Sequence, residues 1–118
     1  MVKEYRLEFL GKWLSINEAY SVNRWKRNAV KKEWNERFKL MIAEAGIQPF
    51  TVFELEIVFR SRMDVENVAA GTKILVDTLK TEGIIPNDDG RYYKSFTSRR
   101  DQSLAHNTHQ ITIRVIEE

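Results

Sequence analysis

The sequence contains no cysteine and only two histidines, His106 and His109, among its 118 residues. Disulfides, thiolate zinc sites and cysteine nucleophiles are therefore excluded, and any metal must be held by oxygen or by these two histidines. We therefore expect an ion that binds oxygen ligands, Mg²⁺ or else Mn²⁺. Because no third histidine and no H-E-x-x-H pattern accompanies the pair, we expect both histidines to be surface residues.

Long apolar runs are also absent. No stretch approaches the roughly 20 consecutive apolar residues that a membrane span needs, and residues 1–5 lack the apolar core of a secretory signal. We therefore expect a cytoplasmic protein with no membrane partner. The G-x-G-x-x-G, Walker and G-x-S-x-G elements are missing too, so we expect neither a nucleotide cofactor nor serine-hydrolase chemistry.

Glycine and proline are scarce, with five and two residues that occur singly between periodic segments. The sequence has no internal repeat and no linker, and its length fits one domain over residues 1–118. Its composition, 42% hydrophobic and 31% charged, is typical of a globular protein.

Apolar residues recur with helical spacing in two segments and with strand-like spacing in four. The predicted elements are a strand over 5–9, a helix over 30–46, a strand over 50–60, a helix from its cap Asp64 to Gly83, and strands over 92–100 and 110–116. Residues 15–23 are expected to form a loop, and the last two strands a hairpin. This order predicts an α+β (mixed α/β) domain with about four strands in a mixed sheet and two main helices.

The charge is distributed unevenly, although its net value is only +2. Residues 24–39 contain seven basic and two acidic side chains. This stretch is either a solvated helix face or a surface for nucleic acid. The candidate DNA-binding residues are Arg24, Lys26, Arg27, Lys31 and Lys32. Trp34 lies on the apolar stripe and is expected in the core, whereas Trp25 could stack on a base or cover the domain.

Four carboxylates lie near the two ends of the second predicted helix. Asp64 and Glu66 stand at the strand-to-helix junction, and Asp88 and Asp89 occupy a turn after the helix. If the chain returns to the sheet, these groups meet and their repulsion is best relieved by a divalent cation. Mg²⁺ on such a cluster could activate water against a phosphodiester. Taken singly, Asp64 could also be only a helix cap and Asp88–Asp89 only a turn signal.

The whole stretch resembles the RusA family of Holliday junction resolvases. It reads Asp64-Val65-Glu66-Asn67, then Lys73 with Asp77 four residues later, then Gly83-Ile84-Ile85-Pro86-Asn87-Asp88-Asp89. That family shows a D-x-D-N element, a helix with K-x-x-x-D, and an apolar run before a D-D pair. The match covers about a quarter of the chain, and Ser15-Ile16-Asn17 is similar to the family's S-x-N loop more weakly.

Two features depart from the family pattern. Glu66 stands where the family usually has aspartate, and Lys73 follows Asn67 by six residues instead of three. Glutamate can still bind Mg²⁺, although its carboxylate lies farther from the backbone. Three extra helical positions turn a side chain by about 300° and advance it by about 4.5 Å, so Lys73 keeps nearly the same face.

The resemblance implies a Mg²⁺-dependent endodeoxyribonuclease that resolves four-way DNA junctions as a homodimer, in recombination and repair. By resemblance, Asp64, Glu66 and Asp89 are the metal ligands, with Asp88 as a substitute, and Lys73 lies near the scissile phosphate. Two alternatives stay open: a nucleic-acid-binding module whose metal site has decayed at Glu66, and a nuclease that cuts other branched or flapped DNA.

Overall fold

The computed structural model describes residues 3–118, which form four strands and three helices. In chain order these are β1 (Lys3–Leu10), α1 (Ile16–Ala19), α2 (Arg24–Glu44), β2 (Val52–Arg60), α3 (Ala69–Thr81), β3 (Tyr93–Arg100) and β4 (Thr108–Glu117). The four strands form one mixed sheet, and α2 and α3 are the two main helices. The predicted fold class is therefore confirmed.

The strand order is β1-β4-β2-β3, with β4 antiparallel to both of its neighbours and β3 parallel to β2. The predicted hairpin of the last two strands is therefore wrong. Alternating apolar residues suit β4 to the sheet centre, where Ile111, Ile113 and Val115 are buried. The polar strand β3 suits an edge, and the crossover through α3 brings it there in parallel.

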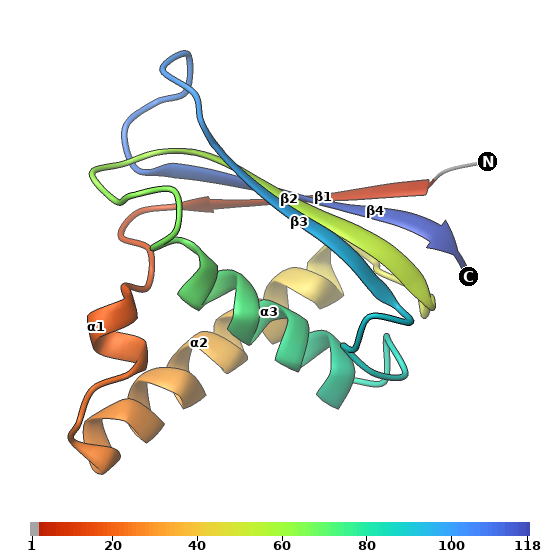
Figure 1. Ribbon diagram of the computed structural model, residues 1–118, viewed down its shortest axis with the longest axis horizontal. Coiled ribbons are helices and arrows are strands. Elements are labelled where there is room, and N and C mark those ends of the chain that lie inside the picture. Colours follow the sequence, from red (N-terminus) through yellow and green to blue (C-terminus); the bar gives the residue numbers. More distant parts are fainter. Residues whose placement is uncertain (1–2) are drawn as a thin grey trace.

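Helices α2 and α3 lie against the same face of the sheet (Figure 1). Alternate residues of β2, namely Phe53, Leu55, Ile57 and Phe59, are at most 1% exposed and build the core on that side. Helix α2 contributes Trp34, Phe38 and Ile42, and α3 contributes Leu75 and Leu79. The helical stripe and the central strand were both predicted from their spacing, and both are confirmed.

Helix α3 begins at Ala69 and not at Asp64, so the predicted cap is wrong. Residues 65–68 form a turn in which the amide of Asn67 donates to the carbonyl of Asp64 at 3.0 Å. The start of the helix is fixed by Trp13, whose indole Nε1 donates to the carbonyl of Val68 at 2.9 Å. A Cβ at Gly71 would collide with the same indole, so glycine lets the helix pack closely there.

The predicted loop at residues 15–23 contains the single-turn helix α1. Ser15 and Glu18 form a capping box, in which the Glu18 amide donates to Ser15 Oγ at 3.2 Å. A four-residue helix is too short to show an apolar period, but the S-x-x-E spacing was a signal for it.

His109 is fully buried, so its predicted surface position is wrong, whereas His106 is exposed as expected. The register of β4 places His109 opposite Phe9 and Phe59 on the face that packs against the helices. Its ring stacks on Trp13 at 5.0 Å and on Phe59 at 6.0 Å. Burial lowers the pKa of His109 to about 4, so the imidazole is neutral in the folded protein at pH 7.

Candidate functional site

The solvent side of α3 carries Lys73 and Asp77, one helical turn apart on a helix whose other face is buried. Lys73 lines a cavity of about 370 Å³ together with Asp88, from the turn before β3. Three aromatic residues also line this cavity, namely Tyr20, Tyr93 and Phe96. Burial raises the pKa of Tyr93 to about 12, so this phenol stays uncharged well above neutral pH.

Asp77 and Asp88 are close enough to influence each other. Desolvation raises the pKa of Asp77, and the negative charge of Asp88 raises it further. The positive charges of Lys73, Lys80 and Lys31 oppose this shift. Since Lys31 belongs to α2, the basic helix contributes to the electrostatic environment of Asp77. A carboxylate perturbed by a like charge beside cations is typical of a functional site.

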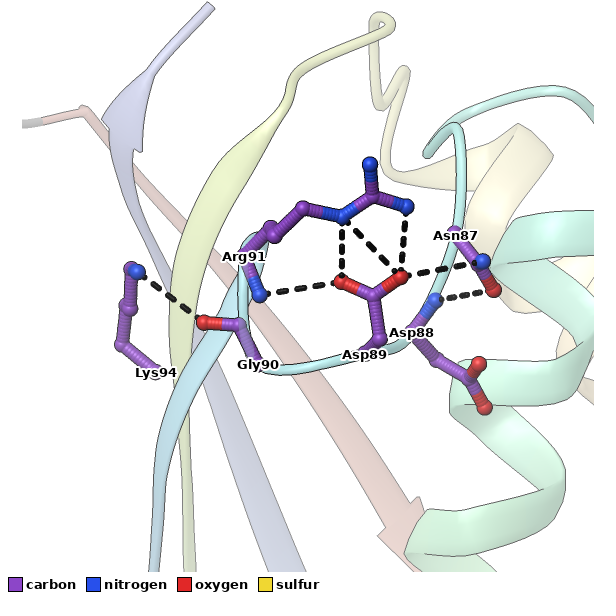
Figure 2. Close-up of polar contacts among 6 residues, drawn as sticks. All are labelled: Asn87, Asp88, Asp89, Gly90, Arg91 and Lys94. Atoms are coloured by element: carbon purple, nitrogen blue, oxygen red, sulfur yellow. Dashed lines mark hydrogen bonds and ion pairs between the residues drawn. The ribbon is translucent and has the colours of Figure 1, made fainter.

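The two aspartates of the turn before β3 differ in their contacts and in the direction of their carboxylates (Figure 2). Arg91 binds the Asp89 carboxylate, with Nη2 at 2.8 Å from Oδ2 and Nε at 3.1 Å from Oδ1. Asn87 Nδ2 donates to the same carboxylate at 3.1 Å. The hydrogen bonds from Arg91 lower the pKa of Asp89. The Asp88 carboxylate instead points toward α3 (Figure 2). Asp89 therefore fastens the turn, while Asp88 faces the cavity.

Asp64 and Glu66 are exposed on the turn that leads into α3. That turn is attached to β3, because Ser98 Oγ donates to the carbonyl of Val65 at 2.6 Å. It is also attached to α1, because the amide of Ile16 donates to Asn67 Oδ1 at 3.3 Å. Neither contact directs Asp64 or Glu66 toward the cavity.

The two acidic turns lie beside different parts of β3. The amide of Tyr93 donates to the carbonyl of Asp89 at 2.9 Å, so the Asp89 turn meets the start of the strand. The Asp64 turn meets Ser98, five residues farther along. At about 3.3 Å per residue, this step spans roughly 16 Å. The structure thus brings Lys73, Asp77 and Asp88 together, and it leaves Asp64 and Glu66 apart from Asp89.

The predicted ligand set does not fit a single ion in this arrangement. Among residues 3–118, no three histidine, aspartate or glutamate side chains are grouped to hold a metal. Carboxylates are the ligands that Mg²⁺ prefers, but ligand oxygens must lie about 2.1 Å from the ion. Asp89 is moreover already bound to Arg91. The chemistry of the residues suits Mg²⁺, whereas their placement does not.

The basic half of α2, residues 24–32, carries all five candidate DNA-binding side chains. Within residues 3–118 none of the five forms an ion pair with a carboxylate. Farther along the helix, by contrast, Arg37 pairs with Glu33 at 2.7 Å and Lys39 with Glu82 at 3.4 Å. The first turn of α2 holds no acidic residue, although cations at a helix N-terminus oppose the helix dipole. These unpaired cations therefore form a surface suited to a polyanion.

Two residues of this region were missed as site residues. Asp77 entered the sequence argument only as part of a family motif, although its i,i+4 spacing from Lys73 on an apolar helix was a usable signal. Tyr20 lines the cavity and lies under Lys31, whose Nζ is 5.9 Å from the ring centroid. No sequence pattern indicated that contact.

No protein-family model matches this chain, and no curated protein matches it. The resemblance to RusA resolvases therefore depends on the motif residues alone. In the described part of the chain, 3–118, no helix has the length and apolar character needed to cross a bilayer.

Proposed function

We propose that this chain is an endodeoxyribonuclease that resolves four-way DNA junctions in recombination and repair. The observation that carries the proposal is that Lys73 and Asp88 line one cavity next to Asp77, whose pKa is also influenced by Lys31 from the basic half of α2. In phosphodiester hydrolysis, cations bind the phosphate and stabilise the charge that develops on it, and carboxylates can hold the metal ion that activates water.

Each group then has a distinct task. The basic half of α2 binds the DNA backbone by charge, which selects shape and phosphate position over base identity. Lys31 and Lys73 hold a phosphate near the cavity, and Lys73 offsets the negative charge that develops there during cleavage. Asp88 is the carboxylate that faces this phosphate, since Asp89 is bound to Arg91.

Dependence on Mg²⁺, or Mn²⁺, is part of the proposal. Because the described arrangement does not gather Asp64, Glu66 and Asp89, those three alone do not account for ion binding. An ion bound by this set requires the Asp64 turn and the Asp89 turn to approach each other. We therefore expect DNA and Mg²⁺ together, but neither alone, to shorten the distance between labels placed on the two turns.

A twofold homodimer in the cytoplasm completes the proposal. A four-way junction needs two symmetric cuts, and one chain offers one candidate site. Two sites related by a twofold axis would address two strands of the junction. Sedimentation of the protein with a junction should therefore give two chains per DNA molecule.

The second candidate function is a nucleic-acid-binding module without catalysis. It is favoured by the Arg91 contact to Asp89 and by the absence of a three-residue metal group within residues 3–118. This candidate uses the same basic half of α2, so DNA binding alone does not separate the two functions. Only strand cleavage does.

The deciding experiment is incubation of the full chain with a synthetic four-way junction, a flapped duplex and a plain duplex, with Mg²⁺ or with chelator. Cleavage of the junction alone, and only with Mg²⁺, supports the proposal. Binding without cleavage supports the second candidate, and equal cleavage of the flap supports a nuclease of broader range.

Paired variants then identify the working carboxylate. Asp88→Asn should abolish cleavage and retain or tighten binding, because it removes a negative charge that faces phosphate. The family resemblance predicts the same for Asp89→Asn. If Asp89 only stabilises its turn, Arg91→Ala should reproduce the Asp89→Asn defect. If Arg91→Ala instead cleaves at the wild-type rate while Asp89→Asn does not, Asp89 takes part in the reaction.

A further inference from the structure

Trp25 is exposed in a way that the fold does not explain. Its side chain is 83% exposed, whereas Trp13 and Trp34 are 2% and 5% exposed. It lies in the first turn of α2, at the end of the helix that projects away from the sheet (Figure 1). The packing alternative from the sequence, in which Trp25 covers the domain, is therefore wrong. An indole of this size normally buries most of its surface.

The backbone around Trp25 is firmly held. Asn23 caps α2 by accepting hydrogen bonds at Oδ1 from the amides of Trp25, at 3.0 Å, and Lys26, at 3.1 Å. The indole thus projects from an ordered helical turn and not from a loose loop. A tryptophan on an ordered backbone has only two side-chain torsions to fix, so it binds a partner at low entropic cost.

The neighbours of Trp25 are cations and further exposed apolar groups. Arg24 and Lys26 flank it in sequence, and Val22 is 100% exposed just before the helix. Tyr20, in the segment before α2, is 52% exposed as well. This end of α2 therefore joins an exposed indole to unpaired positive charges, a combination that suits single-stranded nucleic acid.

Other occupants fit this surface less well. A second copy of the chain would place like charges against each other, which disfavours self-association through this patch. A membrane-surface helix needs a continuous apolar face. The apolar face of α2 is instead buried in the core through Trp34, Phe38 and Ile42, so it is not available to a membrane.

We infer that Trp25 stacks on an unpaired or unstacked DNA base while Arg24 and Lys26, in the same helical turn, hold the neighbouring phosphates. This inference deepens the proposed function and depends on its DNA-binding part. Stacking is available only where bases leave the duplex stack, as at a branch point. Trp25 thereby gives the basic half of α2 a preference for branched over plain DNA, which charge alone does not supply.

The test compares affinities for a plain duplex and for a duplex of equal length and charge that contains an unpaired segment. Chelator is present so that cleavage plays no part. Trp25→Ala should weaken binding to the unpaired DNA by about 5- to 100-fold and binding to the duplex by less than about twofold. The matched control is Leu40→Ala, because Leu40 is 65% exposed on the other half of α2. That variant should change neither affinity.

Fluorescence gives a second, direct readout. Base stacking should quench the emission of Trp25 when unpaired DNA is added. In Trp25→Phe, whose ring still stacks, the remaining emission comes from the buried Trp13 and Trp34 and should stay constant. This variant should also keep most of the affinity for unpaired DNA.

Equal losses on both DNAs, or no loss on either, overturn the inference. So does a Trp25→Ala defect in binding to phosphatidylserine vesicles that exceeds its defect on unpaired DNA. The proposed function fails separately: a selective Trp25→Ala defect in a chain that never cuts a junction leaves the inference standing and removes the nuclease. If Trp25→Ala binds and cleaves the junction with the affinity and rate of the wild type, only the inference is refuted and the proposed function stands.

Discussion

The two halves of α2 differ in almost every physical property, although they belong to one helix. The packed half, residues 33–44, buries Trp34, Phe38 and Ile42 and neutralises its cations in ion pairs. The basic half buries no residue and leaves its cations unpaired within the described chain. One half therefore contributes to folding stability and the other is available for binding. Substitutions in the two halves should have separable consequences.

The largest effect is expected in the packed half. Phe38 is fully buried and packs on Trp13 and Trp34, with ring centroids 5.7 Å away in both cases. Phe38→Ala should lower the free energy of unfolding by about 3–5 kcal/mol in urea titrations. Leu40→Ala, exposed two residues later, is the control and should change it by less than about 0.5 kcal/mol. Similar losses in both variants would contradict the comparison.

Acid should act on the same core through His109. Its pKa is about 4 when folded and near 6.5 when unfolded, because burial disfavours the charged imidazole. The unfolded chain therefore binds the proton first, and stability falls as the pH drops from about 6.5 toward 4. The loss attributable to His109 should approach about 3 kcal/mol at pH 4.

The variants His109→Phe and His106→Ala separate this effect from that of the carboxylates. Urea titrations at pH 7 and pH 4.5 should show a smaller pH-dependent loss for His109→Phe than for the wild type. His106 is exposed, so His106→Ala should keep the wild-type loss. An unchanged loss in His109→Phe would show that the buried imidazole is not its source.

The partition of α2 was only partly visible in the sequence. The stripe through Trp34 and Phe38 repeats with helical spacing, so the packed half was predictable from period alone. His109 shares the parity of Ile111 in β4, so the period would have placed it inward, but the strand was predicted to start at residue 110, two residues after its observed start at Thr108. Because side chains alternate between the two faces of a strand, including His109 in β4 places it on the buried face of Ile111.

Other features depend on long-range contacts that no local pattern contains. The parallel pairing of β3 with β2 follows from the crossover and not from the spacing of Tyr93 and Phe96. The position of Asp88 beside Lys73 and Asp77 likewise depends on how α3 packs next to the turn before β3. Resemblance therefore found the candidate residues, whereas their grouping depends on tertiary contacts.

Charge in the basic half should appear in the salt dependence of DNA binding. Lys26→Gln with Lys32→Gln should reduce the slope of log affinity against log salt by about 2, because each phosphate contact contributes about 0.9. Arg37→Gln with Lys39→Gln removes the same net charge from the packed half, where both cations are paired. Affinities measured between 50 and 200 mM salt should show little change in slope for this control. Equal changes in slope for the two double variants would mean that net charge, and not the position of the charges, controls binding.

The smallest effect should occur at the end of the basic half. Asn23→Ala removes the cap that satisfies the amides of Trp25 and Lys26, at a cost of about 1 kcal/mol. Because only the partly buried Val30 of the basic half packs against the core, fraying of the first turn need not disturb that core. Hydrogen exchange should accelerate in residues 24–28 and stay unchanged around Phe38, whereas Asn23→Asp should preserve the cap. If exchange accelerates equally along all of α2, the helix unfolds as one unit, and its binding and packing halves are not independent.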